Sequence, residues 1–146
     1  MVPRLRIALV AVLALACGGN ESPGQRLQHS VTTFNHAVRW DNLPIAQEFV
    51  PADERDAWLK RRRRIAERVT FLDYEIVEVR HIAMTATDAE VIVTLTWTPK
   101  TSNVVETTRV LQSWRYVEDE KRWELAKQVE SKVDESGDPA DDPDPF

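Results

Sequence analysis

The sequence predicts an α+β domain in which N-terminal helices pack on one face of a curved antiparallel sheet of about four strands. Two observations lead to this fold class. Apolar residues recur at helical spacing as far as Val69 and at alternate positions from Phe71 onward. The alternating segments are separated by short turns, which favours strands joined by hairpins. Because the pattern changes once and no internal repeat is present, we expect a single domain over residues 25–133.

Three helices account for the first part of this domain. The first ends near Arg39 and has one apolar stripe with spacings of four, three and four residues: Leu27, Val31, Phe34 and Val38. The second is short: it begins at Asn42 and ends at Val50, since a proline follows it. The third helix opens at Asp53. The stripe of the third consists of Trp58, Leu59, Ile65, Ala66 and Val69.

Four strands account for the second part. Tyr74 to Ile82 is expected to pair with the next strand across a turn at residues 85–88. That next strand has five apolar residues on one face: Ala89, Val91, Val93, Leu95 and Trp97. The third strand carries Val110, Trp114 and Tyr116, and after a turn at residues 118–121 the fourth carries Trp123 and Leu125. We expect the large rings to form one core between helices and sheet: Phe34, Trp58, Trp97, Trp114 and Trp123.

The first 16 residues have the parts of a secretory signal. Arg4 and Arg6 form a basic head, ten apolar residues follow from position 7, and Ala16 is a small residue before Cys17. Ten residues cannot cross a bilayer, which needs about 20. The segment resembles a bacterial lipoprotein signal, which implies a lipid such as palmitate on Cys17 and attachment to a membrane of the cell envelope, on its periplasmic face. The alternative is an ordinary secretory signal that ends beside a free cysteine.

Two segments flank the expected domain. Residues 17–24 join Cys17 to it through a stretch of glycine, serine, asparagine and proline, which is typical of a flexible tether. Residues 134–146 contain six carboxylate side chains and three prolines, and we expect this acidic tail to be disordered.

Charge and cysteine content exclude some classes of protein. Removal of residues 1–16 takes two of the 19 basic residues and none of the 24 acidic ones, which leaves a net charge of −7. An acidic chain is not expected to bind nucleic acid, whose binding modules usually carry a basic face. With one cysteine the chain forms no internal disulfide, so packing alone stabilises the fold.

Three features in this order resemble the nuclear transport factor 2-like superfamily, and within it small bacterial lipoproteins of unassigned function. They are the run Phe34-Asn-His-Ala-Val-Arg-Trp-Asp-Asn42 before a short helix, the Ala89/Val91/Val93 strand, and the ending Trp114-Arg-Tyr-Val-Glu-Asp-Glu-Lys-Arg-Trp123-Glu-Leu125. The resemblance implies a cone-shaped domain with an apolar cavity.

The resemblance leaves two functions open. One is a non-catalytic, lipid-anchored domain that binds a small apolar ligand or a partner protein. The other is an isomerase or dehydratase-like enzyme that uses an inward carboxylate in the cavity as general base. Asp73 and Glu75 share a strand face and are the only hint of such a carboxylate. The residues on the opposite face of this strand are at least as apolar, so the sequence does not show which face points inward. The oligomeric state is also open, and a dimer fits the superfamily.

Two polar residues fall among apolar ones and are candidate ligand-binding residues. Arg62 lies in the middle of the stripe of the third helix, where its stem either covers the core while the guanidinium reaches solvent, or the guanidinium binds an anionic group at the mouth of the cone. Gln112 lies on the apolar face of the third strand and needs either a core partner or a wet cavity. The other cations of the run Lys60–Arg64 should ring the outer side of the helix, where they either face solvent or are attracted to an anionic membrane leaflet.

The remaining candidates point to no further chemistry. His29 and His36 lie opposite the apolar stripe of the first helix and should face water, which argues against a metal site. The sequence carries no nucleophile elbow, phosphate-binding loop or paired histidine and carboxylate. We therefore assign no catalytic residue, no metal ligand and no cofactor.

Overall fold

The computed structural model describes residues 22–81 and 87–130, and it contains an α+β domain. Three helical segments come first: α1 (Pro23–Arg39), α2 (Leu43–Ala46) continued by a 3-10 turn (Gln47–Phe49), and α3 (Arg55–Arg68). Four strands follow: β1 (Val69–His81), β2 (Asp88–Pro99), β3 (Glu106–Val117) and β4 (Arg122–Glu130). The predicted fold class and order of elements are confirmed.

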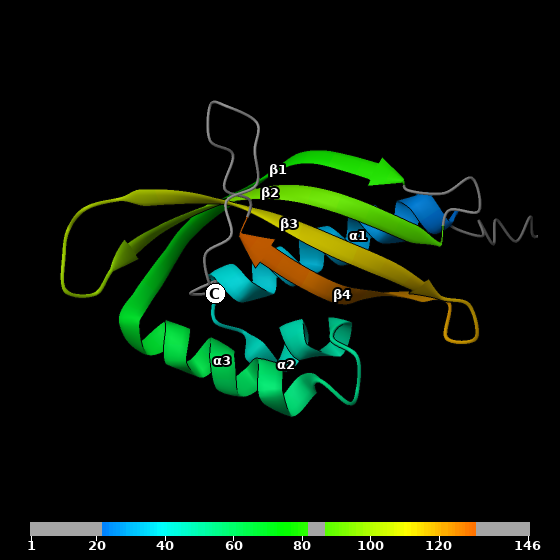
Figure 1. The fold of residues 1–146 in the computed structure, drawn as a ribbon, viewed down its shortest axis with the longest axis horizontal. Helices are drawn as coiled ribbons and strands as arrows, with labels where there is room; N and C mark the ends of the chain where they lie inside the picture. Colours follow the sequence, from blue (N-terminus) through cyan, green and yellow to red (C-terminus); the bar gives the residue numbers. More distant parts are fainter. Residues whose placement is uncertain (1–21, 82–86, 131–146) are drawn as a thin grey trace, which may run out of the picture.

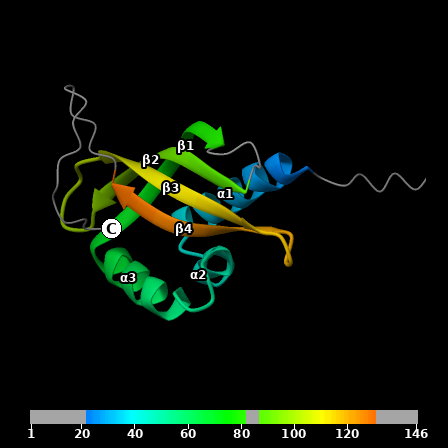
Figure 2. The same ribbon diagram turned by 45° about the vertical axis from the view of Figure 1, so that its right-hand side comes forward.

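The four strands form one antiparallel sheet in the order β1-β2-β3-β4. Figures 1 and 2 show the strands bending around α1, with α2 and α3 on the same side of the sheet. The concave face therefore encloses a helix and the convex face does not. No helix in the described ranges is long and apolar enough to cross a membrane.

The start of α1 corrects the predicted tether. Ser22 is the N-cap: its hydroxyl accepts a hydrogen bond from the Gln25 amide, and the Gln25 side chain accepts one from the Ser22 amide. This reciprocal pair is a capping box, which together with Pro23 in the first turn fixes where a helix begins. Residues 22–24, which we assigned to the tether, therefore belong to the start of the helix.

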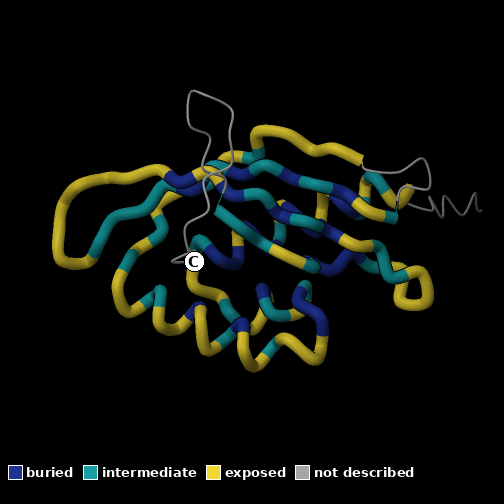
Figure 3. Tube along the Cα trace, viewed as in Figure 1, coloured by how far each residue is buried: buried dark blue, intermediate teal, exposed yellow. Residues whose placement is uncertain are grey.

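The core lies between α1 and the concave face of the sheet (Figure 3). Phe34 is at its centre, with its ring centroid 5.7 Å from that of Trp114 and 6.0 Å from that of Trp58. Trp114, Trp123 and Phe34 are almost fully buried. Trp97 differs from the prediction, because it is only partly buried and lies at one end of the core.

Two bulges in β1 determine which of its side chains point inward. The pairing with β2 slips between Phe71 and Asp73 and again between Ile76 and Glu78. Each extra residue switches the face on which the following side chains lie. Consequently Asp73 and Glu75 are exposed, and the predicted hint of inward carboxylates on this strand is wrong.

Candidate functional site

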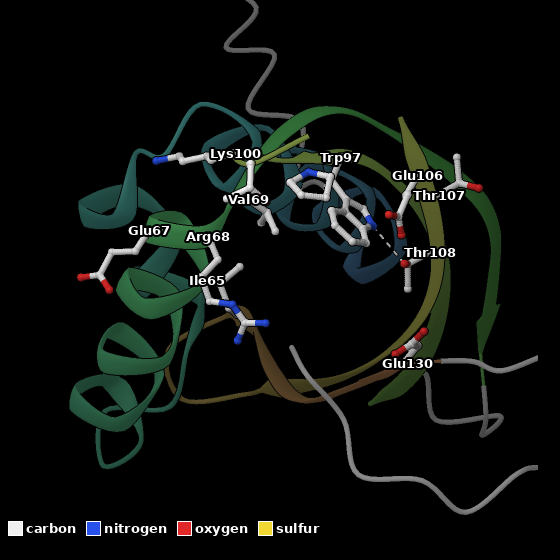
Figure 4. Close-up of a pocket in the computed structure, with 12 residues that line it drawn as sticks. Ile65, Glu67, Arg68, Val69, Trp97, Lys100, Glu106, Thr107, Thr108 and Glu130 are labelled. Carbon is white, nitrogen blue, oxygen red and sulfur yellow. Dashed lines mark hydrogen bonds between the residues drawn. The ribbon is translucent and has the colours of Figure 1, made fainter. Parts of the chain in front are cut away.

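A pocket of about 660 Å³ opens at the end of the cone where β2 ends and β3 begins. The C-terminal end of α3 forms the opposite wall, and Val69, which pairs with Pro99 of β2, lies between the two sides (Figure 4). Its volume is in the range of small-molecule sites, which is about 300 to 1,000 Å³. Twelve residues line it: Ile65, Glu67, Arg68, Val69, Trp97, Pro99, Lys100, Thr101, Glu106, Thr107, Thr108 and Glu130.

The wall of this pocket combines four apolar residues, among them Trp97 with its large ring, and eight polar or charged ones. The Trp97 indole N–H donates a hydrogen bond of 3.0 Å to the hydroxyl of Thr108, which fixes the ring along one side. Figure 4 shows Arg68 on the opposite side of the opening and Glu67 directed away from it. Such a wall suits an amphipathic ligand, with an apolar part against Trp97 and polar atoms toward the charged residues.

Arg62 does not snorkel to solvent, because 7 % of its surface is exposed. Its guanidinium carbon lies 4.8 Å from the centroid of the Phe71 ring and 6.0 Å from that of Trp58. Within the described residues its Nε finds no hydrogen-bond partner. The side chain reaches two cavities that adjoin the main pocket, one of about 150 Å³ and one of about 60 Å³.

Burial lowers the pKa of Arg62 to about 10, while the nearby carboxylate of Asp41 raises it by a smaller amount. The guanidinium therefore stays charged at neutral pH in a place where water does not solvate it well. A buried charge needs an opposite charge or several hydrogen bonds to offset its desolvation.

Gln112 is fully buried and lies in a network of side-chain amides. Its Nε2 donates to Asn35 Oδ1 at 2.9 Å and to Gln128 Oε1 at 3.0 Å. Its Oε1 accepts from Asn35 Nδ2 at 3.2 Å and from the indole of Trp114 at 3.3 Å. Gln112 does not line the pocket beside Trp97, so this geometry gives it a structural partner and no contact with a ligand there.

The other predicted residues are either exposed or lie outside the described part of the chain. His29, His36 and the four cations of the 60–64 run other than Arg62 are exposed, as their helical angles predict. Among residues 22–81 and 87–130, no group of histidine, cysteine, aspartate or glutamate side chains could hold a metal ion. Cys17, the rest of the signal segment and the acidic tail lie outside the described residues, so their predictions stand as predictions.

The residues of the pocket beside Trp97 were missed by sequence reasoning. Trp97 was assigned to the closed core, and Arg68, Glu106 and Glu130 were not considered. They come from α3, β3 and β4, and only the curvature of the sheet brings them to one opening. The one usable signal was that Trp97 is the last apolar residue on the inward face of its strand.

Solved structures of other proteins have a fold similar to that of this chain. A ketosteroid isomerase-like protein from Erwinia carotovora atroseptica SCRI1043 superposes with a TM-score of 0.61 and 20% sequence identity, over 79% of this chain and 98% of that chain. The intermembrane space region of the chloroplast protein ARC6 superposes with a TM-score of 0.48 and 15% identity, over 71% and 92% of the two chains. No family model and no curated protein matches the sequence.

The first likeness shows that the chain has the nuclear transport factor 2-like fold, as the sequence predicts. A fold alone does not select a function, because function resides in the site.

Proposed function

We propose that the protein is a ligand-binding domain, anchored to a membrane of the bacterial cell envelope through lipid on Cys17, that takes a small and largely apolar molecule into the pocket beside Trp97. The pocket itself is the observation that supports this. It combines a volume of about 660 Å³ with the partly buried Trp97 ring, Ile65, Val69 and Pro99. These four apolar residues are where such a molecule would pack, and the polar residues of the lining would orient it.

The isomerase or dehydratase-like alternative needs a carboxylate inside the cone. Asp73 and Glu75 do not supply it, since both are exposed. The carboxylates that do line the pocket within the described residues are Glu67, Glu106 and Glu130. Glu67 and Glu106 are exposed and Glu130 is half-buried, so none is enclosed by apolar surface as a tuned general base is. We therefore place binding first.

Titration with 1-decanol tests whether the pocket binds an apolar chain. Binding is measured by calorimetry and by intrinsic tryptophan fluorescence. We expect saturable binding, weakened about tenfold in Trp97→Ala, because the ring forms one wall of the pocket. Trp40→Ala is the matched control, since Trp40 is 63% exposed and does not line the pocket. Absence of saturable binding, or equal loss in the two variants, would contradict the proposed site.

The anchor is tested separately by fractionation. Cys17→Ala should release the full-length chain from bacterial membranes into the soluble fraction, because the variant lacks the thiol that would carry the proposed lipid. Membrane partition that is unchanged in Cys17→Ala, or a mass that shows an unmodified thiol, would contradict lipid attachment and leave the pocket result unaffected.

A further inference from the structure

A smaller cavity of about 150 Å³ adjoins the pocket beside Trp97, and Arg62 reaches into it. The two cavities share Val69 and Lys100 in their walls. A molecule that fills the larger space could therefore extend a group past Val69 toward Arg62. The smaller cavity is lined by Val38, Arg39, Asp41, Arg62, Ala66, Val69, Thr70, Phe71 and Lys100.

Arg62 is the feature of this cavity that needs a partner. It is more than nine-tenths buried, and its Nε has no hydrogen-bond acceptor among the described residues. Its guanidinium carbon lies over the Phe71 and Trp58 rings, which do not replace the missing acceptor of Nε. A buried charge with an unsatisfied donor is costly, and an anion that enters the cavity would offset that cost.

The charges around the cavity favour an anion. Arg39, Arg62 and Lys100 contribute positive charge, and Asp41 is the carboxylate in the wall. Arg39 already donates to the Leu72 carbonyl at 2.6 Å and lies 3.7 Å from Asp73. Asp41 attracts Arg62 electrostatically without forming an ion pair with it.

We propose that Arg62 binds the carboxylate of an amphipathic ligand whose apolar chain occupies the pocket beside Trp97. This rests on the ligand-binding function proposed above and gives it a ligand class, a fatty-acid-like carboxylic acid. The planar fork of a guanidinium matches the two oxygens of a carboxylate. The apolar wall that continues through Val69 suits the first carbons of the chain.

A matched pair of ligands separates the head group from the chain. Decanoate and 1-decanol have the same length and differ in the group at one end. We expect the full-length wild-type protein to bind decanoate about ten- to a hundredfold more tightly than 1-decanol, the range for one charged hydrogen-bonded contact. Arg62→Met should reduce this ratio to near one and keep the affinity for 1-decanol, because methionine preserves most of the stem.

Two variants and one spectroscopic measurement complete the design. Arg63→Met removes one charge from an exposed neighbour and should leave the ratio unchanged. Arg62→Lys keeps the charge without the fork and should give an intermediate ratio. Independently of any variant, decanoate should shift the Nε–H resonance of Arg62 in the wild-type protein, whereas 1-decanol should not.

Each contrary result has a distinct meaning. Equal binding of decanoate and 1-decanol to the wild type would overturn the role of Arg62 and leave the apolar pocket intact. Failure of both ligands to bind would overturn both proposals. An Arg62 resonance that moves in Asp41→Asn and ignores decanoate would make Asp41 the internal partner of Arg62, which also overturns the proposal.

Discussion

Asn35 and Gln112 bind each other through both of their side-chain amides. Asn35 Nδ2 donates to Gln112 Oε1 at 3.2 Å, and Gln112 Nε2 donates to Asn35 Oδ1 at 2.9 Å. One residue lies on α1 and the other on β3, 77 positions apart, and both are almost fully buried. Because a slip of either element would break both hydrogen bonds, the pair fixes the position of the helix on the sheet.

We predict that this pair acts as a unit. Asn35→Leu and Gln112→Leu should each lower the free energy of unfolding by about 1 to 3 kcal/mol, since each leaves buried amide groups of the partner short of a bond. The double variant should cost less than the sum of the two single changes, because both remove the same two hydrogen bonds. A double-mutant cycle by chemical denaturation measures this coupling, and strict additivity would contradict it.

Trp114 should be one of the most costly side chains to remove. It is 1% exposed, and its ring lies at 5.7 Å from Phe34 and 6.2 Å from Phe49 between centroids. Trp114→Ala should destabilise the domain by about 3 to 5 kcal/mol, a large part of the 5 to 15 kcal/mol typical of a whole domain. Trp40→Ala should stay within about 0.5 kcal/mol, because Trp40 is 63% exposed. Similar thermal midpoints for the two variants would show that Trp114 is not in the core.

Arg62 should make stability depend on alkaline pH. Burial lowers its pKa to about 10 in the folded chain, well below that of an arginine in the unfolded chain, so folding disfavours the charged form. Below about pH 10 both states are charged and the wild type carries this penalty in full. Between the two pKa values the unfolded chain holds the proton that the folded chain has released, so stability from this group rises with pH.

The corresponding measurement compares two variants. Arg62→Met should be more stable than the wild type at about pH 7, by on the order of a few kcal/mol, and this advantage should shrink at about pH 10.5. Arg63→Met should show neither effect, since that side chain is exposed. If Arg62→Met is less stable than the wild type at neutral pH, the guanidinium has a partner that stabilises it.

Features that depend on a local sequence pattern were predictable, and features that depend on distant pairing were not. The stripe through Phe34 and the alternation through Val91 predict the elements, because each depends on a local period and on burial. The faces of β1 could not be predicted, because the bulges near Leu72 and Val77 arise from pairing with β2. Glu130 and Trp97 meet at one opening through the curvature of the whole sheet, which no local period contains.

The position of Pro23 has a consequence for the direction from which a ligand arrives. Its carbonyl accepts a hydrogen bond of 2.8 Å from the indole of Trp123, so α1 begins beside the turn between β3 and β4. The pocket lies at the other end of those strands, about 35 Å away along β3 at about 3.3 Å per residue. A lipid on Cys17 would therefore attach the chain near the turn end of the sheet, with the pocket at the opposite end of the domain. A ligand could then enter the opening from the aqueous phase while the chain stays anchored.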